Sequence, residues 1–417
     1  MKEWINKFKG FLGEWERNRP HADVASSVEQ SIGVEKVAEH CPHCKSKKFV
    51  KRGVRKKKLE MVQLYKCADC SRTFTAQFIK GKHYPMNMII DGLSYYNLGF
   101  GLEDTCRILN RKFGLQDGVA PATLASWVNE YSPLCRYSRL RSFGIKMCKP
   151  EDTIEVMNMA HRQIYRFLYH RAKMRLTLQE FKNRHFEPLK EYLDGVSSET
   201  PHQYFQEGVR ISEIKTKFDK SQMIVRSKNN YANRLADFVL QTVKENKKRH
   251  EALQQFFIAN DSVTVASEVP VYIRKEDVEH MENVLKFKIT DGEEIELSGR
   301  KGQEKNQKFP KLLTGHIDLV QVRNGQIHIL DYKPNAAKEK PIEQLTWYAL
   351  AMSRLTGLRL YEFKCAWFDE KDYFEFYPLH VVKKLQERKK KRRVYLKSHG
   401  TSVEVPNEDL GRKVKVV

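Results

Sequence analysis

The chain has 417 residues, and its 75 lysine and arginine residues outnumber 52 aspartate and glutamate residues, which gives a formal net charge of +23. This length allows two or three domains with a buried core each, and the positive charge favours a polyanionic partner, with nucleic acid as the first candidate. No apolar run approaches the length of about 18 residues that a membrane-spanning helix needs, and the N-terminus lacks the apolar segment of a signal peptide. We therefore expect a cytoplasmic protein that has no membrane partner, with an α+β multidomain fold.

Residues 1–37 carry aromatic side chains at helical spacing, namely Trp4, Phe8, Phe11 and Trp15. This spacing predicts a short amphipathic helix that packs on another element or on a partner. It indicates nothing about chemistry.

Residues 38–80 contain two Cys-x-x-Cys motifs, Cys41 with Cys44 and Cys67 with Cys70, separated by 22 residues. This spacing is typical of a zinc ribbon, in which each motif supplies two thiolates to one structural Zn²⁺ and the intervening segment forms a hairpin. Disulfide bonds are the alternative, but the expected intracellular setting argues against them. His43 lies inside the first motif, and we do not expect it to bind the metal.

The segment between the two cysteine motifs is strongly basic. A charge run is usually only a solvated surface, but on a hairpin held by zinc it is well placed to contact phosphates. The nine basic residues are Lys45, Lys47, Lys48, Lys51, Arg52, Arg55, Lys56, Lys57 and Lys58. We predict that the last four of them, Arg55 to Lys58, contact DNA.

Residues 81–145 contain three short segments with helical patterns, at 86–98, 102–113 and 121–131, separated by turns that contain glycine. Pro121 and Pro133 mark the boundaries of the third helix. Three short helices with such turns fit a helix-turn-helix DNA-binding domain, although ordinary helical cores show the same pattern. In a helix-turn-helix domain the third helix would present Thr123, Ser126 and Trp127 to DNA.

The zinc ribbon followed by this three-helix unit resembles the N-terminal DNA-binding half of insertion-sequence transposases over about residues 38–135. A transposase would continue with a DDE catalytic triad on an RNase H fold, and we find no place for such a triad. Residues 146–224 instead predict a helical connecting region, with long helices at 154–178 and 181–193. We assign no role to its histidines, because such residues are more often solvated or satisfied in a core.

A helix predicted at about 228–247 is followed by a strand at 263–271 in which four valines share one parity. Glu268 has the opposite parity, so it is either an exposed strand residue or an acidic group of a site. The charged stretch 274–311 predicts an insertion with a hairpin turn at Asp291-Gly292.

Two apolar runs joined by Asn324-Gly325 predict a β-hairpin with a two-residue type I′ turn. This turn places Asp318 directly opposite Asp331 on one face of the hairpin, with Cβ atoms roughly 4.5–5.5 Å apart. Lys333 lies two residues beyond Asp331, so it shares this face.

Two opposed carboxylates repel each other unless a cation lies between them, so the hairpin predicts a site for a divalent cation. Such a cation could polarise a phosphate and lower the pKa of a bound water, while Lys333 could stabilise the charge that develops on the phosphate. The alternative is a solvent-exposed polar stripe on an edge hairpin.

Gly315-x-x-Asp318, then Asp331-Tyr332-Lys333, then Gln344-x-x-x-Tyr348 on a predicted helix resembles the motifs of the PD-(D/E)XK nuclease superfamily. The RecB-like branch, which includes the exonucleases of CRISPR adaptation, is the most similar. The resemblance implies a restriction-endonuclease-like α/β core over residues 225–385, followed by a basic C-terminal tail at 386–417.

The same resemblance implies that Asp318 and Asp331 bind Mg²⁺ or Mn²⁺ and that Lys333 assists the attacking water. It also implies that Gln344 and Tyr348 contact the active site or the DNA backbone. Many members carry another acidic residue or a histidine on a preceding helix, but the predicted helix 228–247 offers no obvious match. We therefore favour Glu268 as the third acidic residue.

Together these observations predict a metal-dependent deoxyribonuclease that a transposon-derived zinc ribbon and helix-turn-helix direct to DNA. The alternative is a non-catalytic, sequence-specific DNA-binding protein of transposon origin, such as a transcription or chromatin factor. DNA is the expected partner, with RNA or a recombination or mobile-element protein as further candidates.

Overall fold

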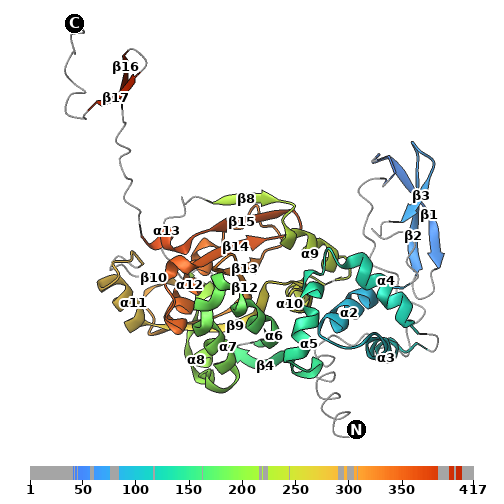
Figure 1. Ribbon diagram of the computed structural model, residues 1–417, viewed down its shortest axis with the longest axis horizontal. Helices are drawn as coiled ribbons and strands as arrows, with labels where there is room; N and C mark the ends of the chain where they lie inside the picture. Colours follow the sequence, from blue (N-terminus) through green and yellow to red (C-terminus); the bar gives the residue numbers. More distant parts are fainter. Residues whose placement is uncertain are drawn as a thin grey trace. The chain divides into compact units, whose positions relative to one another are not determined.

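The computed structural model has two compact units, Met1–Val382 and Lys383–Val417 (Figure 1). It describes residues 41–56 except 42 and 45, 61–75, 84–115, 118–215 except 162, 218, 224–289 except 244, 295–297, 305–307, 309–383, 394–398 and 401–405. The predicted N-terminal helix, the turn at 291–292 and the basic run at 388–393 lie outside these residues. Within the predicted C-terminal tail, the described residues form an antiparallel hairpin, β16 (Val394–Ser398) and β17 (Thr401–Val405).

The cysteine-containing region forms a small three-stranded antiparallel sheet of β1 (Phe49–Lys56), β2 (Met61–Cys67) and β3 (Thr73–Thr75). The hairpin of β1 and β2 lies between the two Cys-x-x-Cys motifs, as predicted. A small core of Tyr65, Phe74 and Phe49 packs beside the cysteines. So few apolar side chains bury little surface, and a domain of this size needs a further cross-link to be stable.

Three helices follow, α2 (Met86–Asn97), α3 (Leu102–Lys112) and α4 (Pro121–Tyr131), and they match the three predicted helices closely. Gly99 and Gly114 have positive φ angles of 116° and 62°, which glycine adopts easily, and they end the first two helices. The apolar faces of the three helices share one hydrophobic cluster with α9 (Tyr231–Leu240), α10 (Arg249–Asn260) and one face of the large sheet. The three-helix region therefore has no separate core, and the boundary predicted near residue 146 does not divide two cores.

The large mixed sheet has nine strands in the order β4-β5-β9-β12-β13-β14-β15-β8, with β6 paired beside β12. Only the pairs β6–β12 and β13–β14 are parallel. The strands are β4 (Ile154–His161), β5 (Gln163–His170), β6 (Val209–Arg210), β8 (Val225–Lys228), β9 (Thr264–Arg274), β12 (Leu312–Arg323), β13 (Gln326–Tyr332), β14 (Phe363–Phe368) and β15 (Asp372–Phe376).

Helices cover both faces of this sheet. The helix α12 (Ile342–Thr356) links the parallel strands β13 and β14, and it shares a second hydrophobic cluster with α7 (Glu187–Glu199). It ends at Gly357, whose φ of 71° is left-handed, a conformation that glycine adopts easily. The other described helices are α5 (Arg141–Met147), α6 (Arg171–Gln179), α8 (His202–Glu207), α11 (Lys275–Asn283) and α13 (Pro378–Val382), with short 3₁₀ helices η1 (Arg136–Arg139), η2 (Pro150–Asp152), η3 (Phe181–Phe186), η4 (Ile211–Glu213), η5 (Asn246–Lys248) and η6 (Leu360–Glu362). A small sheet of β7 (Ile214–Lys215), β10 (Ile295–Leu297) and β11 (Lys305–Gln307) completes the described elements.

The prediction of a long helix at 154–178 is wrong, because residues 154–170 form the antiparallel hairpin of β4 and β5 at the edge of the large sheet. In the second half of β5, Phe167 and Tyr169 enter one hydrophobic cluster while Leu168 enters the other. A strand buried on both faces lacks the alternation of polar and apolar residues that distinguishes a strand from a buried helix.

The hairpin of β12 and β13 has the predicted register, since Leu319 pairs with Leu330 and Arg323 with Gln326. Asn324 and Gly325 both have positive φ angles, 56° and 71°, as a type I′ turn requires. The ladder stops at Leu319, and the Asp318 carboxylate instead accepts a hydrogen bond of 3.2 Å from the backbone N–H of Tyr332. Asp318 and Asp331 therefore lie just where the two strands begin to separate.

One edge of β12 is shared by two strands. Leu313 and Thr314 pair with β6, whereas the pairing with β13 begins only at Leu319. On this edge, residues 315–318 have no partner strand in the part of the chain that the structure describes. This stretch, which we call the β12 gap, separates the end of β6 from the end of β13.

Two buried polar groups fix the C-terminal end of α10. The Asn260 side chain accepts a hydrogen bond from Asn97 of α2 (2.7 Å) and donates one to Ser94 Oγ (2.9 Å). Lys173 of α6 is fully buried, and its Nζ donates to the carbonyl oxygens of Ile258 (2.6 Å) and Thr264 (2.9 Å). These contacts connect α10 to α2, α6 and the start of β9.

The buried Lys173 predicts a pH dependence of stability. Burial lowers the pKa of Lys173 to about 7, although the charge of Asp261 acts in the opposite direction. An unfolded lysine titrates near pH 10.4, so between about pH 7 and 10.4 the folded chain binds fewer protons at this residue, and its stability rises with pH. In Lys173→Met this rise should be absent.

The measurement is the difference in melting temperature between wild type and Lys173→Met as the pH is raised from about 7 to about 9.5. The difference should shift in favour of the wild type. Lys146→Met, at an exposed position of α5, serves as the control. A constant difference between wild type and Lys173→Met over this range would contradict the prediction.

Candidate active site

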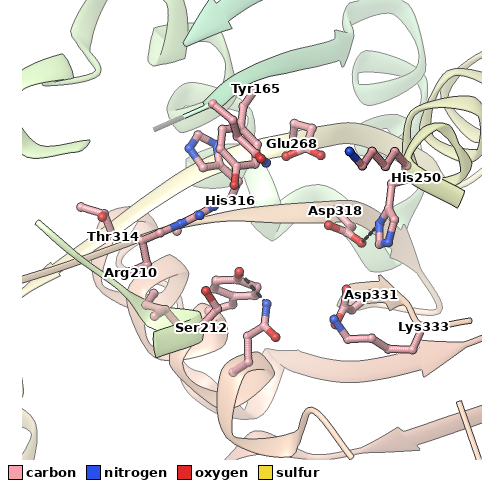
Figure 2. Close-up of a pocket in the computed structure, with 16 residues that line it drawn as sticks. Tyr165, Arg210, Ser212, His250, Glu268, Thr314, His316, Asp318, Asp331 and Lys333 are labelled. Carbon is pink, nitrogen blue, oxygen red and sulfur yellow. Dashed lines mark hydrogen bonds and ion pairs between the residues drawn. The ribbon is translucent and has the colours of Figure 1, made fainter. Parts of the chain in front are cut away.

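A pocket of about 280 Å³ lies at the β12 gap (Figure 2). Its lining comes from the ends of β6 and β13, from β5, β9 and β12, from Gln344 and Tyr348 of α12, and from the start of α10. All six predicted catalytic residues, Glu268, Asp318, Asp331, Lys333, Gln344 and Tyr348, line this pocket. These residues come from four elements that are separate in the sequence, namely β9, β12, the end of β13 and α12. The structure brings them together in one pocket.

Glu268 lies on an irregular part of β9. Its neighbours pair with β12, Ser267 with Leu319 and Val269 with Ile317, which leaves Glu268 in register with Asp318. Glu268 has a φ of 49°, a left-handed conformation that costs free energy in a residue other than glycine. The register places Glu268 on the same face of the sheet as Asp318, and the carboxylates of both residues line the pocket.

Each of the three carboxylates has a polar partner. Lys333 Nζ lies 2.8 Å from Asp331 Oδ2, and His250 Nδ1 lies 3.0 Å from Asp318 Oδ2. Gln254 Nε2 donates a hydrogen bond of 2.6 Å to Glu268 Oε1. In the described part of the chain, the groups that can carry positive charge and contact these three carboxylates are thus two, Lys333 and His250.

The pKa values reflect this imbalance. Burial and the charge of Asp318 raise the pKa of Asp331 to about 8, and the same two causes raise the pKa of Glu268 to about 8. Burial also acts to raise the pKa of Asp318, but the charge of His250 and its hydrogen bond outweigh burial and lower that pKa to about 2. The pocket therefore holds one firmly ionised carboxylate and two whose ionisation a further cation would favour.

His250 and Gln254 were missed in the sequence. The predicted helix at 228–247 ends early, at Leu240, and a second helix, α10, carries the residues that contact the acids. The charge of Asp318 raises the pKa of His250 to about 9, against the opposing effect of burial, so at neutral pH the imidazole is protonated and donates to Asp318. A signal was present, since His250 and Gln254 are polar residues at i and i+4, and this spacing places them on one face of the helix.

Gln344 and Tyr348 of α12 line the pocket beside β12. Gln344 Nε2 donates a hydrogen bond of 2.8 Å to the Tyr348 hydroxyl, as their i, i+4 spacing allows. A Cβ atom at Gly315 would lie only 2.5 Å from Cε1 of Tyr348. Glycine at position 315 is therefore needed for the Tyr348 ring to lie against β12.

The acidic side chains fit a hard divalent cation. Oε2 of Glu268 is buried and has no hydrogen-bond partner among the described residues, so a carboxylate oxygen is left for another ligand. Among the described residues, however, only the four cysteines bring three or more ligand atoms within 4.8 Å of one another, so the carboxylates do not form a closed cage. This arrangement suits Mg²⁺, which usually takes one or two carboxylates and completes its shell with water and substrate phosphate.

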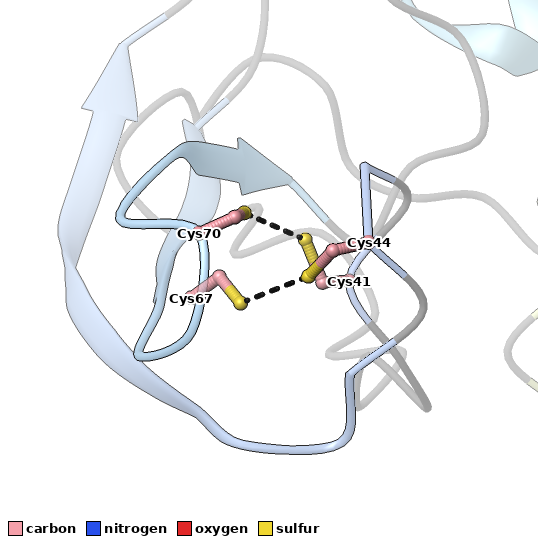
Figure 3. Close-up of side chains that lie close together, drawn as sticks. All are labelled: Cys41, Cys44, Cys67 and Cys70. Carbon is pink, nitrogen blue, oxygen red and sulfur yellow. Dashed lines mark hydrogen bonds between the residues drawn. The ribbon is translucent and has the colours of Figure 1, made fainter.

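The four cysteines of the small sheet form a second candidate metal site (Figure 3). The Sγ atoms of Cys41 and Cys70 lie 3.6 Å apart, and those of Cys44 and Cys67 lie 3.5 Å apart. These distances exceed the roughly 2 Å of a disulfide bond but match the roughly 3.8 Å between ligands of a tetrahedral Zn²⁺ with Zn–S distances of about 2.3 Å. The cluster is compatible with a zinc ribbon.

The residues of the N-terminal half that are predicted to contact DNA differ in their exposure to solvent. Arg55 is exposed on β1, Lys56 ends this strand, and Lys57 and Lys58 lie outside the described residues. On α4, Ser126 is exposed and Thr123 is half-buried, but Trp127 is only 2% exposed and packs against Tyr84 in the hydrophobic core. The prediction that Trp127 contacts DNA is therefore wrong, because its indole fills the core between the helices.

Comparison with known proteins identifies one family. A family model described as the PD-(D/E)XK nuclease superfamily matches residues 179–399, which is 221 of the 417 residues. No curated protein and no solved structure matches the chain. Among the described residues, no helix is both long and apolar enough to span a bilayer.

The geometry of the cysteine cluster predicts one zinc ion per chain, and removing two thiolates should release it. We expect Cys67→Ser/Cys70→Ser to lose zinc and to unfold the small sheet, whose few apolar residues cannot hold it alone. Elemental analysis of the purified chain gives the stoichiometry, with Cys148→Ser, outside the cluster, as the matched control. Unchanged zinc content in the double variant would place the metal elsewhere.

Proposed function

This chain belongs to the PD-(D/E)XK nuclease superfamily, whose members are typically metal-dependent nucleases, and we propose that it hydrolyses phosphodiester bonds of DNA in the pocket at the β12 gap. The observation that carries this proposal is the convergence of Glu268, Asp318 and Asp331 with Lys333 in one pocket. Buried carboxylates without enough positive charge are costly, so such a cluster favours a site that binds a cation over one that only stabilises the fold.

Asp318, Asp331 and Glu268 would hold a Mg²⁺ or Mn²⁺ ion. When bound, the ion would polarise the scissile phosphate and lower the pKa of a coordinated water. His250 supports this binding, because its imidazolium keeps Asp318 ionised and fixes the orientation of the carboxylate.

Lys333 is suited to act on the nucleophile and the phosphate. Its ammonium group is anchored to Asp331, which raises the pKa of Lys333 against the effect of burial, so the group stays charged. A charged donor at this position can orient the attacking water and stabilise the negative charge that develops on the phosphate. Gln344 and Tyr348 line the same pocket and can position the DNA backbone by hydrogen bonding.

We further propose that the zinc ribbon and the three-helix unit deliver the chain to DNA. The exposed basic residues of the ribbon support this role, because Lys47, Lys48, Lys51, Arg52 and Arg55 are all exposed. Such a surface binds phosphates with little regard to sequence. The exposed side chain of Ser126 on α4 would add contacts from the three-helix unit, as in a helix-turn-helix domain.

Cleavage should require both a divalent metal and the ionised acids. We expect Asp331→Asn, which keeps the shape but not the charge, to abolish cleavage of labelled DNA in Mg²⁺ or Mn²⁺ while DNA binding is retained. His250→Ala should lower the rate by about 10- to 100-fold, since it removes a group that positions a ligand. Asp194→Asn, at an exposed position of α7, is the matched control and should cleave like wild type. Cleavage in EDTA, or wild-type rates in Asp331→Asn, would contradict the proposal.

Binding to DNA should depend steeply on salt. Each phosphate contact releases counterions, so the logarithm of the binding constant should fall with the logarithm of salt concentration by about 0.9 per contact. Replacing Lys51, Arg52 and Arg55 by glutamine in the full chain should reduce this slope by up to roughly 3. Fluorescence anisotropy with a labelled duplex at several salt concentrations measures the slope. If the slope is unchanged, the ribbon contacts something other than DNA.

A further inference from the structure

The pocket has a second end that the proposed hydrolysis does not use. Figure 2 shows Arg210 and Ser212 at this end and Asp331 at the opposite end. Arg210 is the last residue of β6, and it pairs with Thr314, which precedes Asp318 by four residues, or roughly 13 Å along β12. A positively charged side chain therefore lies in the same pocket as the three carboxylates but apart from them.

The packing of β6 against β12 fixes the position of Arg210. A Cβ atom at Gly208 would lie only 2.7 Å from Cγ2 of Thr314, so glycine at this position allows the close approach of the two strands. Ile211, which directly follows Arg210, is 1% exposed and belongs to the hydrophobic core. The chain is thus anchored on both sides of the arginine.

Arg210 carries a charge that the folded chain does not neutralise. Its guanidinium makes no hydrogen bond and no ion pair with any described residue, although it is half-buried and lines the pocket. It lies over the ring of Tyr165, with Cζ 5.6 Å from the ring centroid. The Tyr165 ring is in turn stacked on His316, with centroids 3.9 Å apart and planes inclined by 4°. Contact with an aromatic ring restricts the arginine side chain but leaves its charge and its N–H donors available.

A guanidinium that lines a pocket without an acidic partner is suited to bind an anion, and its planar fork matches the oxygens of a phosphate. The exposed side chains of Ser212 and Gln163 line the same pocket and offer neutral hydrogen-bond donors. The proposed substrate supplies suitable anions, because its phosphates repeat along the strand. The carboxylates at the other end repel such phosphates, and a cation beyond them offsets this repulsion.

We propose that Arg210 binds a phosphate of the substrate strand other than the scissile one, and that this contact helps to place the scissile phosphate at the carboxylates. This inference rests on the proposed function and deepens it. The substrate would be a nucleotide chain that continues past the cleaved bond on the side of β6, so that a second phosphate reaches Arg210. The arginine lies outside the motifs of the hydrolytic site.

The test combines a variant of the full chain with changes in the substrate. Cleavage of a labelled oligonucleotide in Mg²⁺ or Mn²⁺ is followed at one mapped bond, and the other phosphates of that strand are replaced one at a time by neutral methylphosphonates. On the unmodified strand, Arg210→Gln should lower kcat/KM by roughly tenfold or more, since it removes a charge-assisted hydrogen bond. At one position, the methylphosphonate should lower kcat/KM of wild type by a similar factor but cause no further loss in Arg210→Gln.

This pairing of one phosphate with one side chain separates binding from general damage, because a merely structural defect would lower the rate on every substrate by the same factor. Arg175→Gln removes an exposed arginine of α6 that does not line the pocket, and it should behave like wild type on all substrates. If thermal unfolding shows that Arg210→Gln does not fold, Arg210→Met keeps an aliphatic contact with Tyr165 and takes its place. Wild-type kcat/KM in the folded variant, or losses that multiply at every position, would overturn the inference.

A binding measurement keeps the inference testable if wild type cleaves no strand, an outcome that would count against the proposed function alone. The same set of labelled oligonucleotides is then bound in Mg²⁺ and measured by fluorescence anisotropy, with Lys51, Arg52 and Arg55 replaced by glutamine so that the ribbon contributes less. In this background Arg210→Gln should weaken binding of the unmodified strand roughly tenfold, and one methylphosphonate position should remove the difference. Equal affinity with Arg210 and with Gln at this position on the unmodified strand would overturn the inference.

Discussion

Mutual repulsion among buried carboxylates is the constraint on which the rest of this structure depends. Glu268, Asp318 and Asp331 share one pocket, and an isolated buried charge costs far more than a surface charge. The positive charges of His250 and Lys333 offset part of this unfavourable free energy, and the rest is not offset. The irregular backbone at Glu268 and the separation of β12 from β13 are further costs that a fold selected only for stability would avoid. Because these unfavourable features occur together at one place, a functional site explains this part of the sheet better than an ordinary polar edge does.

The part of this arrangement that depends on local geometry could be predicted from the sequence. The Asn324-Gly325 turn fixes the register of its hairpin, because only a few residues tolerate two consecutive positive φ angles. Once the register is known, the neighbouring positions of Asp318 and Asp331 follow from the period of two. The ends of α12 and of the three N-terminal helices were predictable for a similar reason, since glycine and proline mark them.

The parts that depend on tertiary contacts could not be predicted in the same way. His250 reaches Asp318 across 68 residues of sequence, and nothing local shows which helix will pack on β12. Trp127 looks like a surface residue of a recognition helix until the neighbouring helices cover it. The sequence of β4 and β5 predicted a helix because the second half of β5 is buried on both faces and lacks the alternation of polar and apolar residues that indicates a strand. The β12 gap has no sequence signature, since it arises from two strands that pair with different halves of a third.

The shared core of the N-terminal helices and the large sheet has a consequence for how this chain can be divided. The family match begins at residue 179, the last residue of α6, and a fragment starting there would lack β4, β5 and the helices that cover α10. Its exposed apolar face would favour aggregation, and α10 would lose the contact of Asn260 with Asn97. The three helices are thus better regarded as structural parts of the folded unit than as an appended module. Exchanging them for those of another protein would require redesign of the surface that they bury against the large sheet and α10.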